Sequence, residues 1–208
     1  MFIQIIQGKC TRKDEVRALS EKWLRELAPG SIGWLGGTYG FTDDDMFVGV
    51  VRFESKEAAM ENSKRPEQSA WWSEMERCFD GPVEFHDTER VMMMMGGGSD
   101  DAGFVQVIRG KVDDPARLEA DIDRMTAVLH DARPDIIGAT IAIEPDGTFT
   151  ETVAFTNEAE AREGESREMP FQGEAAELMR EFDEITHDVS YLDLHQPWFA
   201  SRGAAAGR

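Results

Sequence analysis

The sequence has only two cysteines, no long apolar run and no recognisable targeting segment at its start. Cys10 and Cys78 are too few to form a disulfide framework, and unpaired cysteines suit a reducing cytoplasm. The first residues lack the basic start, apolar middle and small-residue cleavage site of a signal peptide. The longest conspicuous apolar run, residues 91–95, falls far short of the ~20 residues that a membrane-spanning helix needs. We therefore expect a cytoplasmic protein without a membrane-spanning segment.

Positive charge is scarce as well. The chain carries 22 Lys and Arg residues against 41 Asp and Glu residues, which gives a net charge of -19 at pH 7. An acidic surface repels the phosphates of nucleic acids and the headgroups of anionic membranes. We expect neither as a partner and attribute most of the charge to solubility.

Patterns that would indicate a metal site or a familiar catalytic motif are missing too. Neither cysteine has a second cysteine or a histidine at ligand spacing. The acidic run at residues 43–45 lacks the spacing of an EF-hand loop. The glycines at residues 96–98 lack the strand, lysine and helix of a phosphate loop, and no Gly-x-Ser-x-Gly elbow occurs. We predict no bound metal and no cofactor.

What the sequence does contain is an internal repeat. FIQIIQGK at residues 2–9 returns as FVQVIRGK at residues 104–111, a shift of 102 positions. The same shift pairs Gly36 with Gly138. The period is too long for a solenoid repeat, and a copy of about 100 residues has the size of an ordinary domain. The repeat therefore indicates a duplicated domain.

The segment between the two copies is rich in glycine and marks a connection. We predict four parts along the chain: a first unit at residues 1–95, a linker at 96–102, a second unit at 103–195 and a C-terminal tail at 196–208. Trp198 and Phe199 in the tail are expected to dock on the folded body, and the last residues are expected to be disordered.

Each copy has the element order β-α-β-β-α-β. In the first copy the patterns predict strands and helices, in chain order, at residues 2–9, 13–27, 33–41, 46–54, after Ser55, at 67–79 and at 82–94. This order is the ferredoxin-like plan, an antiparallel sheet with its helices on one face. The strands do not alternate cleanly between apolar and polar residues, so the second face should also be covered, most simply by the other copy's sheet.

The predicted fold class is therefore α+β, with two tandem ferredoxin-like βαββαβ units forming a pseudo-dimeric α+β barrel. Because the two fused copies satisfy the barrel internally, we expect either a monomer or a homo-oligomer formed through another surface.

Three segments carry a resemblance to a known family. They are the first strand FIQIIQGK, the strand-to-helix junction RFESKEAAMENS and the helix QSAWWSEMERCF. With them, the chain resembles a fused, tandem version of the dimeric α+β barrel superfamily, in its antibiotic-biosynthesis monooxygenase-like branch. The superfamily also includes haem-degrading enzymes and stress-responsive proteins, and none of the three segments is an active-site signature.

The resemblance leaves two main functions open. The first is a cofactor-independent monooxygenase acting on a small aromatic substrate, because an electron-rich phenol can itself give an electron to oxygen. The second is a non-enzymatic barrel that binds a small ligand or responds to stress. Haem degradation is a weaker third.

Gln4 and Gln106 occupy the same place in the two first strands. A buried amide must find hydrogen-bond partners. Gln4 either binds a ligand, which makes it a candidate catalytic residue, or forms a hydrogen bond within the strand pair or across the pseudo-twofold axis. Its presence in both copies favours the structural bond.

Four of the five tryptophans lie in the first unit. Trp34, Trp71 and Trp72 are candidate substrate-binding residues, because an aromatic wall can hold a flat molecule by stacking. The alternative is a larger apolar core in this unit. Since the second copy has no tryptophan at the matching positions, a single pocket would lie in the first unit.

His86, in the last strand of the first copy, is the best titratable candidate. It could serve as a general base or an iron ligand, although a surface position is more common. By this resemblance, the site of the haem-degrading relatives contains an Asn, a Trp and a His. Here Gln4 stands where the first-strand Asn is expected, and Trp71 and Trp72 fall in a helix instead of a strand, which disfavours haem degradation. The methionine run at residues 92–95 fills a seam or lines a ligand site, with the seam favoured.

Overall fold

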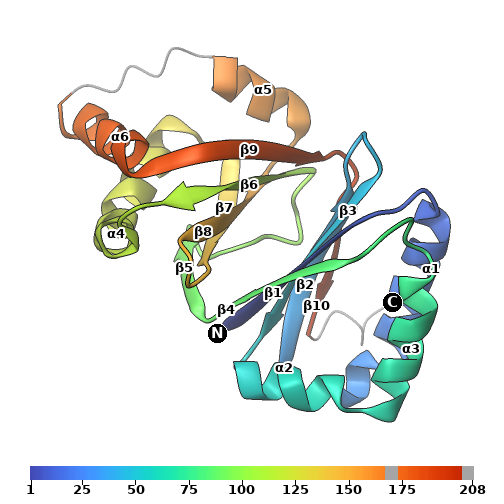
Figure 1. Ribbon diagram of the computed structural model, residues 1–208. Helices are drawn as coiled ribbons and strands as arrows, with labels where there is room; N and C mark the ends of the chain where they lie inside the picture. Colours follow the sequence, from blue (N-terminus) through green and yellow to red (C-terminus); the bar gives the residue numbers. More distant parts are fainter. Residues whose placement is uncertain (167–172, 203–208) are drawn as a thin grey trace. The chain divides into compact units, whose positions relative to one another are not determined.

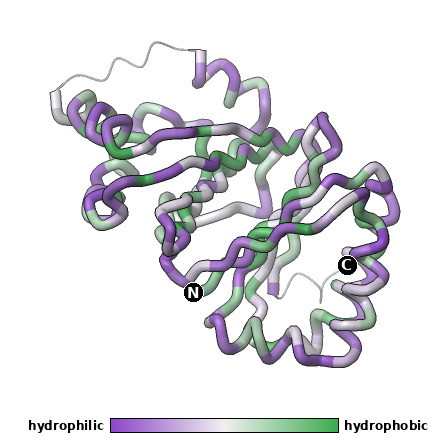
Figure 2. The backbone as a smooth tube through the Cα atoms, viewed as in Figure 1, coloured by the Kyte–Doolittle hydropathy of each residue, from purple (hydrophilic) through white to green (hydrophobic). Residues whose placement is uncertain are grey.

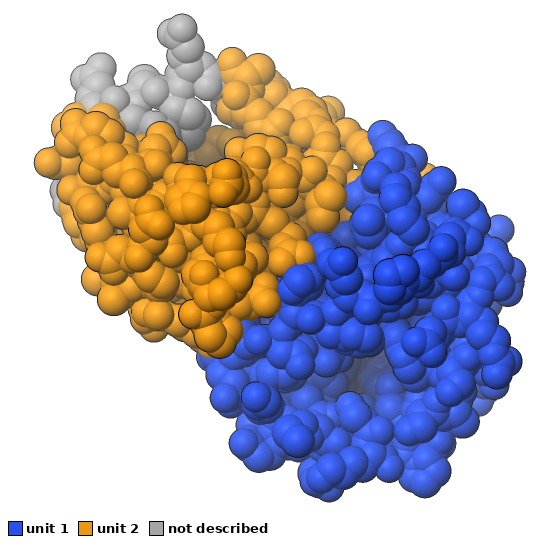
Figure 3. Space-filling view, in the orientation of Figure 1, with its two compact units in different colours: residues 1–89, 198–208 blue, residues 90–197 orange. Residues whose placement is uncertain are grey.

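The computed structural model describes residues 1–166 and 173–202, and Figure 1 shows its elements. These residues form two compact units, one made of residues 1–89 with the chain from Trp198 onward, the other of residues 90–197 (Figure 3). We call them unit 1 and unit 2. Each contains one five-stranded antiparallel sheet with helices, so the α+β class and the tandem arrangement are confirmed.

Unit 1 is built around the sheet order β10-β2-β3-β1-β4. Its elements are β1 (Phe2–Lys9), α1 (Lys13–Glu26), the 3-10 turn η1 (Ala28–Gly30), β2 (Trp34–Phe41), β3 (Met46–Phe53), α2 (Lys56–Ser63), α3 (Pro66–Glu76), β4 (Glu84–Thr88) and β10 (Trp198–Ser201). β1, α1, β2, β3 and α3 each lie within a few residues of their predicted ranges, whereas η1 and β10 were not predicted. The tail docks as expected, since Trp198 pairs with Tyr39 of β2, while the expectation of disorder at residues 203–208 concerns residues outside the described ones.

Unit 2 repeats this plan with the sheet order β5-β7-β8-β6-β9. Its elements are β5 (Arg90–Met94), β6 (Phe104–Val112), α4 (Pro115–Ala132), β7 (Ile136–Ile143), β8 (Thr148–Phe155), α5 (Glu158–Ser166), α6 (Glu174–Ile185) and β9 (Thr186–Leu194). Position by position, the two sheet orders match, and β5 takes the place that β10 holds in unit 1.

The strand predicted at residues 82–94 is divided at Glu89. Its first part, β4, pairs with β1, and its second part, β5, pairs with β7 of the second copy. The end of the second copy does the same, because β9 pairs with β6 while β10 pairs with β2. This exchange gives each sheet five strands instead of the four expected. It also moves the boundary of the compact unit to residues 89–90, ahead of the predicted linker at 96–102.

Local chemistry explains several element ends. The side-chain oxygen of Ser55 accepts a hydrogen bond from the backbone N–H of Ala58 and caps α2, as the sequence predicts. α3 begins at Pro66, where the missing N–H of proline costs nothing. The lysine that ends each copy of the repeated strand reaches the next turn: Lys9 Nζ lies 2.7 Å from Asp44, and Lys111 Nζ lies 2.7 Å from Asp146.

The cores of the two units differ in chemistry. In unit 1 half of the buried residues in the cluster around the helix-covered face are aromatic, with Phe2, Trp23 and Trp34 among them. In unit 2 methionine and isoleucine fill the corresponding space, as with Met125 and Ile141. Figure 2 shows apolar residues concentrated along the strands, while the helices mix apolar and polar residues. The same fold is thus packed in two different ways.

Both cysteines are free and buried. The thiol of Cys10 donates a hydrogen bond to the carbonyl of Cys78 over 3.2 Å, and burial raises the pKa of both thiols. No helix in the described part of the chain is long and apolar enough to cross a membrane. Within residues 1–166 and 173–202, no three His, Cys, Asp or Glu side chains are grouped in a way that could hold a metal ion.

Candidate functional site

Unit 1 contains a cavity of about 380 Å³ between its sheet and the helices α1, α2 and α3. Its floor comes from the side chains of β1, β2 and β3 that face the helices. Most of its wall is aromatic, and the main contributors are Trp23, Trp34, Tyr39, Trp71, Trp72 and Trp198. A cavity of this size and polarity is typical of a small-molecule site.

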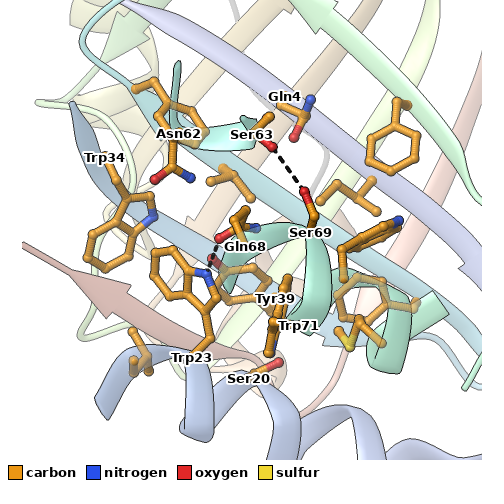
Figure 4. A pocket seen from close by; sticks show the side chains of 18 of the residues that line it. Gln4, Ser20, Trp23, Trp34, Tyr39, Asn62, Ser63, Gln68, Ser69 and Trp71 are labelled. Atoms are coloured by element: carbon orange, nitrogen blue, oxygen red, sulfur yellow. Dashed lines mark hydrogen bonds between the residues drawn. The ribbon is translucent and has the colours of Figure 1, made fainter. Parts of the chain in front are cut away.

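Two of the indole rings, those of Trp23 and Trp71, are held in place by hydrogen bonds to the helices. Trp23 Nε1 donates to the side-chain oxygen of Gln68 over 2.6 Å (Figure 4). Trp71 Nε1 donates to the carbonyl of Leu19 over 2.8 Å. The rings of Trp23 and Trp34 meet edge to face with centroids 5.0 Å apart, a favoured aromatic arrangement. This part of the aromatic wall is therefore held in place by contacts within the protein itself.

The lining of this cavity carries polar groups but no charge. Among the described residues that line it, the polar ones are Gln4, Ser20, Tyr39, Asn62, Ser63, Gln68, Ser69 and Ser73, together with the indole N–H groups. Burial raises the pKa of Tyr39 to about 12, and the nearby Arg52 opposes this effect only in part. The phenol therefore stays protonated at neutral pH and can donate a hydrogen bond but cannot act as a base.

Gln4 lines this cavity, and its side chain also makes a structural hydrogen bond, as the presence of a glutamine at this position in both copies favoured. Its Nε2 donates to Asp87 Oδ1 over 3.0 Å, across the pair of strands β1 and β4. The corresponding Gln106 donates to Asp193 Oδ1 over 2.9 Å, across β6 and β9. The same amide–carboxylate pair thus joins the first and last strands of both copies.

Changing Gln4 to glutamate should destabilise the protein by roughly 1 kcal/mol at pH 7, because two carboxylates would then lie opposite each other on one face. Urea denaturation measures the loss. The double variant Gln4→Glu with Asp87→Asn should recover most of it, since a donor and an acceptor again face each other. An equal loss in the single and double variants would contradict this role of the pair.

His86 lies outside the cavity. Side chains alternate along a strand, and its neighbour Phe85 lines the cavity, so His86 leaves β4 from the opposite face. There its Nε2 lies 3.6 Å from a carboxylate oxygen of Glu84. The structure thus brings Gln4, Trp34, Trp71 and Trp72 together and leaves His86 apart, which corrects the expectation that His86 shares a site with them.

Unit 2 contains a cavity of its own, about 670 Å³ in volume. The shift of 102 residues places Gln106 and Ile108 where Gln4 and Ile6 lie in unit 1, and Met125 where Trp23 lies. The sequence placed the pocket in the first unit if the protein has a single one, and the structure has a cavity in each unit. Met94 and Met95, from the methionine run, line this cavity instead of only filling a seam.

Sequence reasoning overlooked the most unusual residue of the second cavity. Glu151 on β8 corresponds to Gly49 on β3, and its carboxyl group lines the cavity. Burial alone raises its pKa from the usual 4.5 to about 7. The signal was the repeat itself, because one copy places a glycine where the other places a carboxylate.

Comparison with known proteins supports the fold. No family model and no curated protein matches the sequence. Among solved structures, a candidate monooxygenase from Lactobacillus acidophilus NCFM is similar over 97% of this chain and 96% of its own, with a TM-score of 0.68 and 13% identity. A candidate monooxygenase from Fusobacterium nucleatum subsp. nucleatum ATCC 25586 is similar over 97% and 94%, with a TM-score of 0.72 and 7% identity. An anthrone oxidase-like protein is similar over 98% and 94%, with a TM-score of 0.66 and 9% identity.

Each of these likenesses covers nearly the whole chain, so it includes both copies. The identities are low, and what they show is the fold. The chain therefore shares its fold, two tandem α+β units that each contain an antiparallel sheet with helices, with these solved structures.

Proposed function

We propose that this protein is a cofactor-independent monooxygenase that oxidises a small, flat aromatic substrate in the cavity of unit 1. The observation that carries the proposal is the uncharged cavity of about 380 Å³ walled by fixed indole rings. Such walls hold a planar molecule by stacking and exclude water. The similarity in fold to candidate monooxygenases and to an anthrone oxidase-like protein is consistent with it.

The indole N–H of Trp198 is available to fix the orientation of the substrate. Trp198 lines the cavity, and its Nε1 is buried with no hydrogen-bond partner among the described residues. Buried donors are normally paired, so a phenol or carbonyl oxygen of the substrate is a suitable partner. The ring of Trp198 stacks on Tyr39 with centroids 5.7 Å apart, which keeps this donor in place.

The substrate itself would supply the electrons. An electron-rich phenol, or the enol of a related ketone, loses its proton to solvent before it enters the cavity, and the bound anion gives one electron to O2. The resulting substrate radical and superoxide combine to a peroxide, which takes up a proton from solvent. Loss of water from the peroxide leaves a new carbonyl group, so one O2 is consumed and one water released for each product. The protein's part is to stack the ring, orient its oxygen and keep bulk water away.

The second candidate function, a non-enzymatic small-ligand-binding or stress-responsive protein, is favoured by one specific observation. Within the described lining of the unit 1 cavity, no residue can accept a proton at neutral pH. Haem degradation is not proposed, because His86, its candidate iron ligand, lies on the other face of β4.

Oxygen uptake with anthrone as the substrate separates the two candidates. We expect uptake of one O2 per anthraquinone formed, unchanged by EDTA. Trp71→Ala should lower kcat/KM at least about tenfold, because the stacking surface is lost. Met125→Leu, which alters the second cavity alone, is the matched control and should leave the rate unchanged.

Tryptophan fluorescence read in the same samples identifies the alternative. Quenching by anthrone without oxygen uptake would overturn the monooxygenase proposal and support a binding protein. Neither quenching nor uptake would overturn the assignment of the unit 1 cavity to an aromatic ligand.

A further inference from the structure

The cavity of unit 2 holds a carboxyl group that no part of the proposed oxidation uses. Glu151 lies on β8, in register with Ile108 on one side and Ile141 on the other. Both neighbours are apolar, and the side chain is only partly exposed. Isolated carboxylates are rarely left in such surroundings, because desolvation penalises their charged form.

No described residue forms a hydrogen bond or ion pair with Glu151. The two arginines that line the same cavity form ion pairs with other carboxylates. Arg133 pairs with Asp135 at 2.7 Å, and these two side chains are only 12% and 9% exposed. Arg162 pairs with Asp193 and, at 3.0 Å, with Glu165. The charge of Glu151 is therefore the uncompensated one in this cavity.

The charged groups around the cavity disfavour an anionic ligand. Glu165 of α5 and Asp193 of β9 add two carboxylates to its lining, and Gln106 donates to both of them. With Glu151 this makes three acidic groups, and neither arginine of the lining is left without a carboxylate partner. A bound anion would meet Glu151 without a free cation to offset it.

The rest of the wall suits a flexible apolar body. Met94, Met95, Met125 and Met179 line the cavity together with Leu129 and Ile136. Methionine side chains are unbranched and polarizable and adapt to irregular shapes. The indole wall that favours a flat ring in unit 1 has no counterpart here.

We propose that the cavity of unit 2 is a second, independent binding site, which takes a small alkylammonium compound and pairs its N–H groups with the carboxylate of Glu151. The alkyl chain lies against the methionines, and the ammonium group supplies the missing counter-charge. This site goes beyond the proposed oxidation and does not depend on it, since the two cavities share no lining residue.

Methionine methyl groups report on this site directly. The full chain, labelled with carbon-13 at its methionine methyls, is titrated with n-hexylammonium chloride at pH 8. We expect the signals of Met94, Met95, Met125 and Met179 to shift in a saturable way. Met75, which lines the cavity of unit 1, should not shift. Absence of saturable shifts at millimolar ligand, or shifts at Met75 alone, would overturn the proposal.

Two variants and a neutral ligand test the ion pair. Glu151→Gln should weaken hexylammonium binding at least about tenfold. Glu163→Gln removes the same charge at an exposed position of α5 and should leave the affinity unchanged. Hexan-1-ol should bind the parent and Glu151→Gln alike, and its binding to the variant shows that the cavity stays intact. It should bind the parent more weakly than hexylammonium does. Equal ammonium affinity in the parent and Glu151→Gln would overturn the role of Glu151.

Discussion

Replacement of Gly138 by alanine is expected to destabilise the protein by roughly 3 kcal/mol. A Cβ atom at this position of β7 would lie 1.8 Å from the carbonyl oxygen of Gly97. The oxygen belongs to the backbone and the position of Cβ is fixed by its own backbone, so no side-chain rotation can relieve the overlap, and the chain after β5 would have to move away from β7. Chemical denaturation monitored by circular dichroism measures the loss as a lower midpoint.

Gly81→Ala is the matched control for this prediction. A Cβ atom at Gly81 would meet nothing within 4 Å, so the change should stay within about 0.5 kcal/mol of the parent. Gly36, the counterpart of Gly138 in unit 1, should behave like Gly138, because its Cβ would lie 2.6 Å from the carbonyl oxygen of Ala200. Equal midpoints for Gly138→Ala and Gly81→Ala would show that the segment at Gly97 does not pack as described.

Changing Glu151 to glutamine should make the protein more stable at pH 8, by up to an amount on the order of 3 kcal/mol. Burial raises the pKa of this carboxyl group to about 7 in the folded state, from 4.5 in the unfolded chain. The folded state therefore binds the proton more tightly. The stabilisation that this bound proton gives to the folded state is fully present below pH 4.5, and it is lost as the pH rises through 7. Glutamine stays neutral and avoids that loss.

The measurement is the free energy of unfolding of both proteins between pH 4.5 and pH 8. The two curves should meet at the acidic end and separate as the pH rises. Carboxylates whose pKa is lowered by partners, such as Asp44 and Glu158, affect both proteins equally and cancel in the difference. Glu163→Gln should follow the parent at every pH. A constant difference across the range would mean that Glu151 is not buried in its charged form.

Much of the fold could be predicted because the sequence contains two copies of the same pattern of strands and helices. FIQIIQGK and FVQVIRGK fix two equivalent strands, and the turn residues between the next two strands recur at Asp44 and Asp146. The division of the last strand at Glu89 could not be predicted in this way. Residues on both sides of Glu89 have strand character, and which sheet each part joins depends on pairing with residues far away in the sequence.

The candidate site, too, could be predicted from the sequence only in part. The excess of tryptophans in the first copy pointed to the cavity of unit 1, because composition alone carries that signal. The face of His86 depends on the register between β4 and β1, which a single sequence does not fix. The role of Glu151 could not be predicted from the repeat, because the two copies differ at this position and only the fold shows that its side chain lines a cavity.

The exchange of strands, together with the fusion, also bears on how a protein acquires two specificities. Trp198 reaches the first cavity from the end of the second copy, and Met94 reaches the second cavity from the end of the first. In a dimer of identical chains, every amino-acid change would alter both pockets at once. A single gene that encodes both copies frees each pocket from the other, so an indole wall can persist in one while a carboxylate arises in its twin.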